Sequence, residues 1–463
     1  MPSPRSSLPR SAVRRSLGLA VPEGMLYAGM VGCAETWFVV DAIRLGASPF
    51  EQALVVGLPL GVGALGSLAA LRLMRHVPSR RALVASFTAL QALALLALAL
   101  LDAIGRQTPA LLVAGASLYH VAGQGASPGW TSWYGDLVPE RIRGNYFARR
   151  MKAVQATICA SMVVAGFALQ LLEPRLIFGA ATTAWWPALA APGRGFALIF
   201  LLAGLSRLAS TLLLLRSPEP SFQGLAPAAR VVQFLRTSRG STAWRLIVGS
   251  AGYYAVVYLA SPFFLPFMAH ELHFSYLMLM GAFALQIALK SVLQVRFGEW
   301  IDRHGARAVW LLGVLGCALV PLPYLWAGGW PWVYASQFAA GITWGCLEIA
   351  LFVLVLHTTF RATRPHAIAA QSSLNGIAQL LGSVAGGLFL SLDGATFRRL
   401  FAISIVARCL FVLLLPRLVR PRPGGGDTGA KALLLRVVGV VPSGGLAHEV
   451  DLPEERPRRD GDR

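Results

Sequence analysis

The chain has 463 residues, of which 56% are hydrophobic and 13% are charged, and its formal net charge is +20. Soluble domains carry about 25% charged residues, so this composition leaves too little polar surface for a water-soluble body and predicts an integral membrane protein. The positive charge alone is compatible with nucleic-acid binding, but its placement along the chain argues against that class.

Twelve segments are apolar over a length that crosses a bilayer, which takes about 20 residues of helix. In the first half of the chain they are residues 22–43, 52–73, 82–101, 109–134, 153–172 and 196–215. In the second half they are residues 246–268, 276–295, 308–326, 332–356, 367–392 and 396–415. The apolar run after the basic N-terminus is long, which indicates a first membrane helix and not a cleaved signal peptide.

These segments divide the chain into five expected regions. A cytosolic N-terminal tail precedes a six-helix bundle, a polar cytosolic linker, a second six-helix bundle and a Gly- and Pro-rich cytosolic tail that we expect to be disordered. The regions are residues 1–21, 22–215, 216–245, 246–416 and 417–463.

Basic residues between the segments concentrate on one side of the predicted membrane. If the N-terminus is inside, the inside segments before the C-terminal tail contain 23 lysines and arginines, whereas the outside segments contain six. This positive-inside bias predicts cytosolic termini and a multi-pass protein of the plasma (inner) membrane. The charged stretch WYGDLVPERIRGNYFARR, residues 133–150, is then a cytosolic loop, and we expect no nucleic-acid partner.

The sequence carries no pattern typical of catalysis or of metal binding. Its five cysteines lie far apart inside apolar segments, which predicts neither a disulfide framework nor a zinc site. It lacks the motifs Gly-x-x-x-x-Gly-Lys-Ser/Thr and His-Glu-x-x-His. We therefore expect no P-loop ATP hydrolysis, no enzyme activity, no cofactor and no metal.

The two halves of the chain share an internal repeat. Arg207 and Arg408 each lie in the last helix of a half, nine residues before a terminal arginine, Arg216 or Arg417. Parallel halves of this kind are a common transporter plan. The predicted fold class is all-α integral membrane, with twelve transmembrane helices in two pseudo-symmetric six-helix bundles.

The stretch FGEWIDRHGAR, residues 297–307, carries the sharpest motif in the chain. It resembles the signature loop of the major facilitator superfamily of secondary transporters, Gly-x-x-x-Asp-Arg-x-Gly-x-Arg, at Gly298, Asp302, Arg303, Gly305 and Arg307. We expect Gly298 to allow close helix approach and Gly305 to adopt a positive φ. The resemblance implies a bacterial-type transporter in which this loop latches the outward-facing state, with Asp302 pairing to Arg303, Arg307 or a helix N-terminus.

The matching loop of the first half lacks the glycines and the aspartate of this motif. Asp136 and Arg143, with Gly144 at a turn, could supply the gating charges instead, since they resemble the loop between helices 4 and 5 in many bacterial members. The alternative is that these charges only mark a solvated loop.

Ionisable groups inside spanning helices are costly and usually face protein or water. The resemblance places helices 1, 4, 7 and 10 around a central cavity, and Glu35 and Glu348 lie on helices 1 and 10. Each is a candidate carrier of a coupling proton, or else a tie to a neighbouring helix. Polar and aromatic residues that could line the cavity, or alternatively pack between helices, are His120, Gln124, Tyr254, Tyr258, Trp344, Gln371 and Asn375.

Three basic residues also fall within spanning segments. We expect Arg207 and Arg408 to tie helices together, because the resemblance makes their helices peripheral. Lys290 could extend its amine to the inner surface or face the cavity.

These observations predict a secondary active transporter that moves a small molecule by alternating access. We expect coupling to a proton gradient or to another ion, and we favour export because the predicted cavity is aromatic and lightly charged. Uptake of a nutrient or other solute is the alternative within the same class. A membrane sensor or assembly factor on the same fold is the alternative in another class. The expected partners are a small-molecule substrate, an ion and the lipid bilayer, and we expect a monomer.

Overall fold

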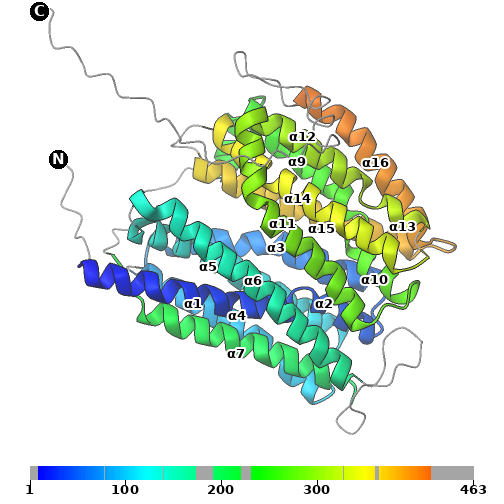
Figure 1. Cartoon of the computed structure of the whole chain (residues 1–463), viewed down its shortest axis with the longest axis horizontal. Coiled ribbons are helices and arrows are strands. Elements are labelled where there is room, and N and C mark those ends of the chain that lie inside the picture. The colour runs from blue at the N-terminus through cyan, green and yellow to red at the C-terminus, as the bar shows by residue number, and fades with distance from the viewer. Residues whose placement is uncertain are drawn as a thin grey trace, which may run out of the picture.

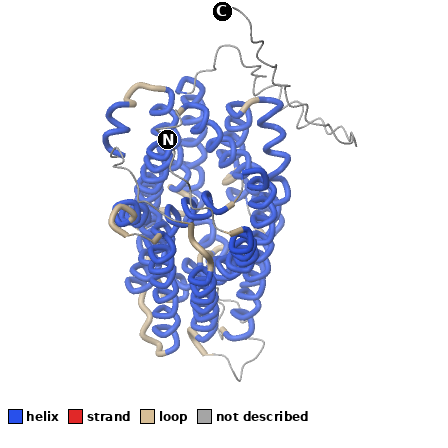
Figure 2. Tube along the Cα trace, turned by 90° about the vertical axis from the view of Figure 1, so that its left-hand side faces the viewer, coloured by secondary structure: helices blue, strands red, loops and turns tan. Residues whose placement is uncertain are grey.

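The structure is a computed structural model, and it describes residues 9–77, 79–138, 140–173, 191–220, 231–326, 328–359 and 364–418. In this part of the chain all regular secondary structure is helical, and short loops join the helices (Figure 2). Ten of the described spans are long and apolar enough to cross a membrane. The expected N-terminal and C-terminal tails lie largely outside the described residues.

The first half of the chain forms seven helices, of which the first two belong to one span. They are α1 (Arg10–Ala34), α2 (Trp37–Arg44), α3 (Pro49–Leu73), α4 (Arg80–Ala103), α5 (Pro109–Leu137), α6 (Glu140–Leu172) and α7 (Arg194–Arg216).

The second half repeats this plan after a short linker helix. Its elements are α8 (Val231–Thr237), α9 (Thr242–Tyr258), the 3-10 helix η1 (Ser261–Phe263), α10 (Phe264–His270), α11 (Tyr276–His304), α12 (Ala306–Leu319), α13 (Leu322–Trp326), α14 (Trp330–Thr358), α15 (Arg364–Leu390) and α16 (Phe397–Leu418).

Several spans begin earlier than hydropathy predicts, because polar capping residues start the helix before its apolar run. Ser48 accepts a hydrogen bond from the Glu51 backbone while the Glu51 carboxylate accepts one from the Ser48 backbone, a complete capping box at α3. Ser79 and Thr108 cap α4 and α5 in the same way. Their hydroxyl oxygens satisfy backbone N–H groups that have no partner within the helix.

The prediction of a loop over residues 133–150 is wrong. α5 continues to Leu137 and α6 begins at Glu140, so the predicted start of the fifth span at residue 153 is too late by more than three turns. Charged residues extend these two helices beyond the apolar core. Hydropathy alone found the apolar part of each helix and not its polar end. The linker expected at 216–245 likewise contains α8 and the start of α9.

The first span of each half is broken at a corresponding position. Glu35 and Thr36 separate α1 from α2, and the turn after Tyr258 with η1 separates α9 from α10. In the second half Pro262 and Pro266 lie at this break, and a proline inside a helix removes one backbone hydrogen bond. Interrupted helices expose polar backbone groups at the depth where transporters bind their ligands.

The helices form two lobes. In the first lobe α3 packs on α5, α4 packs on α7, and α1 packs on α6 and α7; in the second, α14 packs on α11 and α12, and α15 packs on α9. Between the lobes α3 packs on α15 and α6 packs on α11. The first lobe fills the lower part of Figure 1 and the second lobe the upper part. α1 begins and α16 ends at the same end of the molecule, which we call the terminal end (Figure 1).

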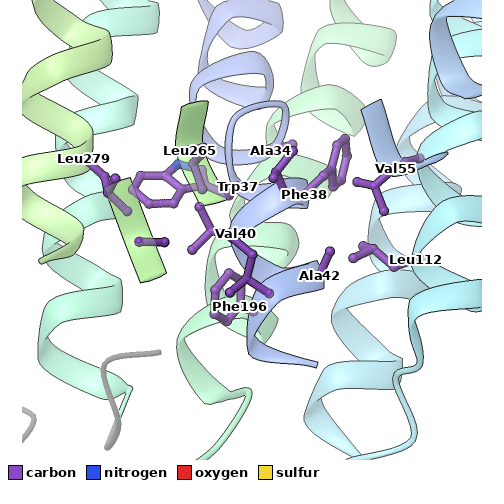
Figure 3. Close-up of a cluster of buried hydrophobic side chains, with 14 of the residues drawn as sticks. Ala34, Trp37, Phe38, Val40, Ala42, Val55, Leu112, Phe196, Leu265 and Leu279 are labelled. Atoms are coloured by element: carbon purple, nitrogen blue, oxygen red, sulfur yellow. The ribbon is translucent and has the colours of Figure 1, made fainter. Parts of the chain in front are cut away.

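One hydrophobic cluster joins the lobes at the opposite end. It contains Trp37, Phe38 and Phe196 from the first lobe together with Phe267 and Tyr276 from the second. Figure 3 shows α2 at its centre, with Leu265 and Leu279 beside Trp37. We call it the junction cluster and its location the junction end. The other buried clusters lie toward the terminal end, and each stays within one lobe.

Candidate functional site

Glu35 lies at the break in the first span, directly before the junction cluster. Its side chain is exposed, and Tyr119 of α5 donates a hydrogen bond of 2.9 Å from its hydroxyl to Glu35 Oε1. Tyr119 itself is buried, and its ring packs edge-on against Phe38 of α2. The contact therefore positions a carboxylate beside a neutral donor, where it can accept a proton or meet a cationic group.

His120 and Gln124 lie one turn apart on α5 and face α3. A Cβ atom at Gly63 of α3 would lie 3.3 Å from Gln124 Cγ and about 4 Å from His120 Cβ. His120 is half-buried beside Tyr119, whereas Gln124 is exposed. The glycine permits this close approach, and the two side chains extend the polar region that begins at Glu35.

The second lobe carries an aromatic group next to an ion pair. The ring of Tyr254 lies 6.5 Å from that of Tyr258 and 6.0 Å from that of Trp344. Glu348, one turn beyond Trp344 on α14, forms an ion pair with Lys290 of α11. The two charged side chains are 42% and 36% exposed, so the pair is accessible to water and its charges cancel. Lys290 is therefore paired with Glu348, in contrast to the sequence-based alternative in which its amine extends alone to the inner surface.

Gln371 and Asn375 lie about one turn apart on α15, the helix that packs on both α3 and α9. Both side chains are half-buried, and Asn375 Oδ1 is a buried acceptor without a hydrogen-bond partner. A Cβ at the neighbouring Gly376 would lie 2.5 Å from the backbone oxygen of Leu60. Asn375 thus lies at the contact between the lobes, where a change in their relative position would alter its surroundings.

The signature loop of the second half has one of the two glycine features expected. Gly305 has a φ of 81° between α11 and α12, in agreement with the prediction. Gly298 has no atom near a Cβ built on it, so the expectation that it allows close helix approach is wrong. Asp302 and Arg303 are exposed, and within the described residues no ion pair of Asp302 is found, whereas Arg307 has an interaction partner.

Asp136 pairs with a residue that the sequence did not single out. Arg80, at the start of α4, donates to Asp136 Oδ2 at 2.5 Å and to the hydroxyl of Ser132 at 3.0 Å. Glu219, just after α7, accepts hydrogen bonds of 2.6 Å from both the Ser79 hydroxyl and the Arg80 backbone. The start of the linker is therefore fastened to α4. Arg143 and Gly144 belong to α6, but their side chains lie outside the described part of the structure.

Comparison with known proteins links the second half of the chain to a family. The sequence pattern described as Major Facilitator Superfamily matches residues 246–446, and a comparison with curated proteins found no match. Solved transporters match the fold over about nine-tenths of the chain.

Three solved structures show how far the structural resemblance of this chain extends. A bacterial homolog of the human lysosomal transporter Spinster, inward-facing and unoccupied, is 14% identical and covers 90% of this chain and 100% of its own, with a TM-score of 0.65. A D-xylose-proton symporter is 14% identical over 89% and 99%, with a TM-score of 0.66. The xylose transporter XylE from E. coli, partially occluded and inward open, is 13% identical over 90% and 99%, with a TM-score of 0.60.

These matches confirm the twelve-helix, two-bundle membrane fold. α5 and α16, with 29 and 22 residues, complete the set of twelve spans.

A buried network ties the first lobe of this protein together. Arg207 on α7 donates from Nε to Gln91 Oε1 at 2.8 Å and from Nη1 to Ser210 Oγ at 3.2 Å. Ser210 in turn donates to Glu23 at 3.1 Å, and Glu23 pairs with Arg150 of α6 at 2.9 Å. The sequence predicted Arg207 as a tie between helices but not its partners, because Gln91 is 116 residues from Arg207 and Glu23 is 187 residues from Ser210.

Arg408 occupies the corresponding place in the second lobe and has different partners. It donates to the backbone oxygens of Cys317 at 2.9 Å and Val257 at 2.7 Å, and to the Ser404 hydroxyl at 3.0 Å. Val257 lies just before the break in the first span of this lobe. Arg408 therefore supplies donors to carbonyl groups near the interrupted helix.

Proposed function

We propose that this protein is a secondary transporter that moves a small, partly apolar organic compound through a cleft between its lobes, driven by a proton gradient, and that export is its direction. The observation that carries the proposal is the exposed carboxylate of Glu35 at the break between α1 and α2, bonded to the neutral Tyr119. It gives the first lobe a charge that a proton or a cationic ligand group can neutralise.

The second lobe supports the apolar part of the proposal. Tyr258 and Trp344 are half-buried beside Tyr254, and aromatic rings with a few polar groups are typical of small-molecule sites. Tyr258 ends α9 just before residues of the junction cluster, as Glu35 does in the first lobe. These corresponding positions support a site whose two sides lie at a similar depth, next to the junction cluster.

The two candidate carboxylates are expected to differ in role. Glu348 already has a cationic partner in Lys290, and protonating it would leave that amine unpaired. Among the described residues, the hydrogen-bond partner of Glu35 is the hydroxyl of Tyr119. Protonating Glu35 therefore removes its charge and leaves no other charged group unpaired. We therefore assign proton coupling to Glu35, and ligand contact to Glu348 and Lys290.

The orientation follows from the distribution of basic residues. The excess of lysine and arginine on the side of the N-terminus supports cytosolic termini in the plasma membrane. The junction cluster would then lie toward the external face, where it joins the lobes. A site closed on that side would take its compound from the cytosol, which supports export; uptake is the alternative outcome.

The test begins with a thermal-shift screen of the purified protein against a compound panel, since a ligand stabilises the state that it binds. The compound found is then followed in proteoliposomes with and without an imposed pH gradient. Glu35→Gln should keep ligand binding and lose pH-driven flux, whereas Glu299→Gln, an exposed acid of α11, should retain both. Flux of Glu35→Gln that still follows the pH gradient would overturn the role of Glu35. Accumulation of the compound in cells that express the protein would favour uptake.

A further inference from the structure

A second set of ionisable groups lies buried at the junction end, away from the proposed ligand site. Asp41 and Arg44 belong to α2, and Asp102 belongs to the last turn of α4. Arg44 Nε donates to Asp41 Oδ1 at 2.7 Å, and Arg44 Nη2 donates to Asp102 Oδ1. Both aspartate side chains are fully buried, and that of Arg44 is 16% exposed. Two carboxyl groups therefore share one guanidinium.

Glu173 adds a third carboxyl group to this region, but the backbone satisfies it. Its two oxygens accept hydrogen bonds from the backbone N–H groups of Gly195 at 2.8 Å and Gly193 at 3.3 Å, at the start of α7. A helix N-terminus favours a negative charge. The backbone therefore supplies the hydrogen bonds of Glu173, which interacts with Arg44 only through space, and its charge makes the surroundings of Asp41 and Asp102 more negative.

Each of the two aspartates has one carboxylate oxygen whose capacity to accept hydrogen bonds is not fully used. The second oxygen of each, Asp41 Oδ2 and Asp102 Oδ2, is buried without a well-aligned hydrogen bond, and the amide of the buried Gln107 is the polar side chain that approaches Asp41. A buried charge without partners is unfavourable, and two like charges in one site rarely ionise together. One proton on this pair would cancel the surplus charge and provide a hydrogen for one of the free acceptors.

The junction cluster separates this pair from solvent. The Arg44 guanidinium lies 4.9 Å from the centre of the Phe196 ring, and Phe196 contacts the ring of Tyr276 at 6.4 Å. Tyr276 also contacts Trp37 of α2 at 6.5 Å. Tyr276 is the first residue of α11, so a side chain of the second lobe covers charged groups of the first. Its hydroxyl is buried without a partner.

We propose that Asp41 and Asp102 together hold one exchangeable proton, and that they exchange it with solvent only when Tyr276 withdraws from Phe196 and Trp37. This inference rests on the proposed alternating motion of the lobes but not on Glu35 as coupling residue. The proton binds a carboxylate oxygen and returns to water from the same oxygen, so that no other bond forms or breaks. Arg44 bonds to both carboxylates and would repel a metal cation, which favours a proton as the occupant.

The charged groups around the pair come from several elements. Arg44 lies on α2 itself, Glu173 follows α6, and Tyr276 approaches from α11. Of the other helices that pack on α2, α3 carries Glu51, which is engaged by Ser48, and α10 carries His270, which has an interaction partner. α7, which packs on α4, begins at Arg194, and this residue also has an interaction partner. Arg44 is the cation with hydrogen bonds to both aspartates.

Infrared difference spectroscopy of the purified protein detects the proton without any transport measurement. The wild-type protein should show the carbonyl band of a buried protonated carboxylic acid at neutral pH. The band should be lost in Asp102→Asn and in Asp41→Asn, each of which leaves Arg44 one carboxylate. Glu271→Gln, an exposed acid at the same end, should keep the band. A wild-type protein without the band, or a band that persists in both asparagine variants, would overturn the proposal.

The gating role of Tyr276 has its own measurement. In heavy water the band should shift slowly in the wild-type protein and rapidly in Tyr276→Ala, because the alanine opens the cover. Equal exchange rates would contradict a gate at Tyr276, and a band that responds to sodium but not to pH would assign the site to a metal cation. Glu35→Gln should keep the band. Loss of proton-driven flux in Glu35→Gln with an intact band would thus separate the two proposals.

Discussion

Lys290 of α11 and Glu348 of α14 form an ion pair on the second lobe, next to the aromatic group of Tyr254 and Trp344. More than a third of each side chain is exposed, so water screens the attraction, and pairs of this kind contribute about 0–1 kcal/mol to stability. The pair is therefore of more interest for ligand recognition than for folding.

The first prediction concerns this pair. Lys290→Met and Glu348→Gln should each leave the unfolding temperature in detergent almost unchanged and weaken ligand binding, by about tenfold if one charge-assisted hydrogen bond is lost. In the double variant the loss of binding free energy should be smaller than the sum of the two single losses, because neither charge is then left unpaired. Titration calorimetry with the ligand from the thermal-shift screen measures the effect. Strictly additive losses would contradict a functional pair.

The second prediction concerns the buried network of the first lobe. Arg207→Met removes the cation that contacts Gln91 and Ser210, and Glu23→Gln leaves Arg150 without its carboxylate. Breaking a buried pair on one side costs about 3–5 kcal/mol, so Glu23→Gln should lower the unfolding temperature strongly. Lys152→Gln, at an exposed position of α6, is the control and should have little effect. Stability of Glu23→Gln equal to that of the control would show that this ion pair does not support the fold.

The third prediction compares two glycines of the signature loop. Gly305 has a φ of 81° and a ψ of 145°, a backbone region close to one that essentially only glycine adopts, so Gly305→Ala should destabilise the protein by about 1–3 kcal/mol. Gly298 lies inside α11 with free space at its Cβ position. Gly298→Ala should therefore be neutral or stabilise by up to about 1 kcal/mol, since alanine favours helix. Thermal unfolding of the two variants side by side checks both values. Equal destabilisation would contradict the geometry of the loop.

The fourth prediction is a pH dependence from Glu173, which follows the last residue of α6. Burial raises the pKa of Glu173 above its ordinary value of 4.5, against the effect of the Gly195 N–H and of Arg44. Because the folded state holds the proton more tightly, this group favours folding below pH 4.5, and its contribution is lost as the pH rises through the folded pKa.

Glu173→Gln should remove that contribution. The unfolding temperature of the variant should fall less than that of the wild type when the pH is raised from about 4 to neutral. Glu51→Gln, at the exposed capping box of α3, controls for acids whose environment is solvated. A variant that follows the wild-type pH profile would refute the assignment.

The sequence by itself determined the architecture of this protein. A bilayer requires every backbone polar group to be satisfied within a helix, over about 20 apolar residues, so twelve apolar runs specified twelve spans. The repeat of Arg207 and Arg408 and the motif at Gly298–Arg307 indicated two halves of a Major Facilitator Superfamily carrier. Residues such as Glu35 and Glu348 stood out because charges are rare inside such helices.

Only the tertiary structure decided which of these groups meet. Arg44 and Asp102 are 58 residues apart in the sequence, and Arg80 and Glu219 are 139 residues apart, yet a hydrogen bond joins each pair. Lys290 of α11 likewise contacts Glu348 of α14. Hydropathy locates a segment along the membrane normal but does not fix its rotation or its neighbours, which depend on packing between helices. The polar ends of α5 and α6 escaped prediction for a related reason, because capping and long-range ion pairs, not apolar length, extend those helices into water.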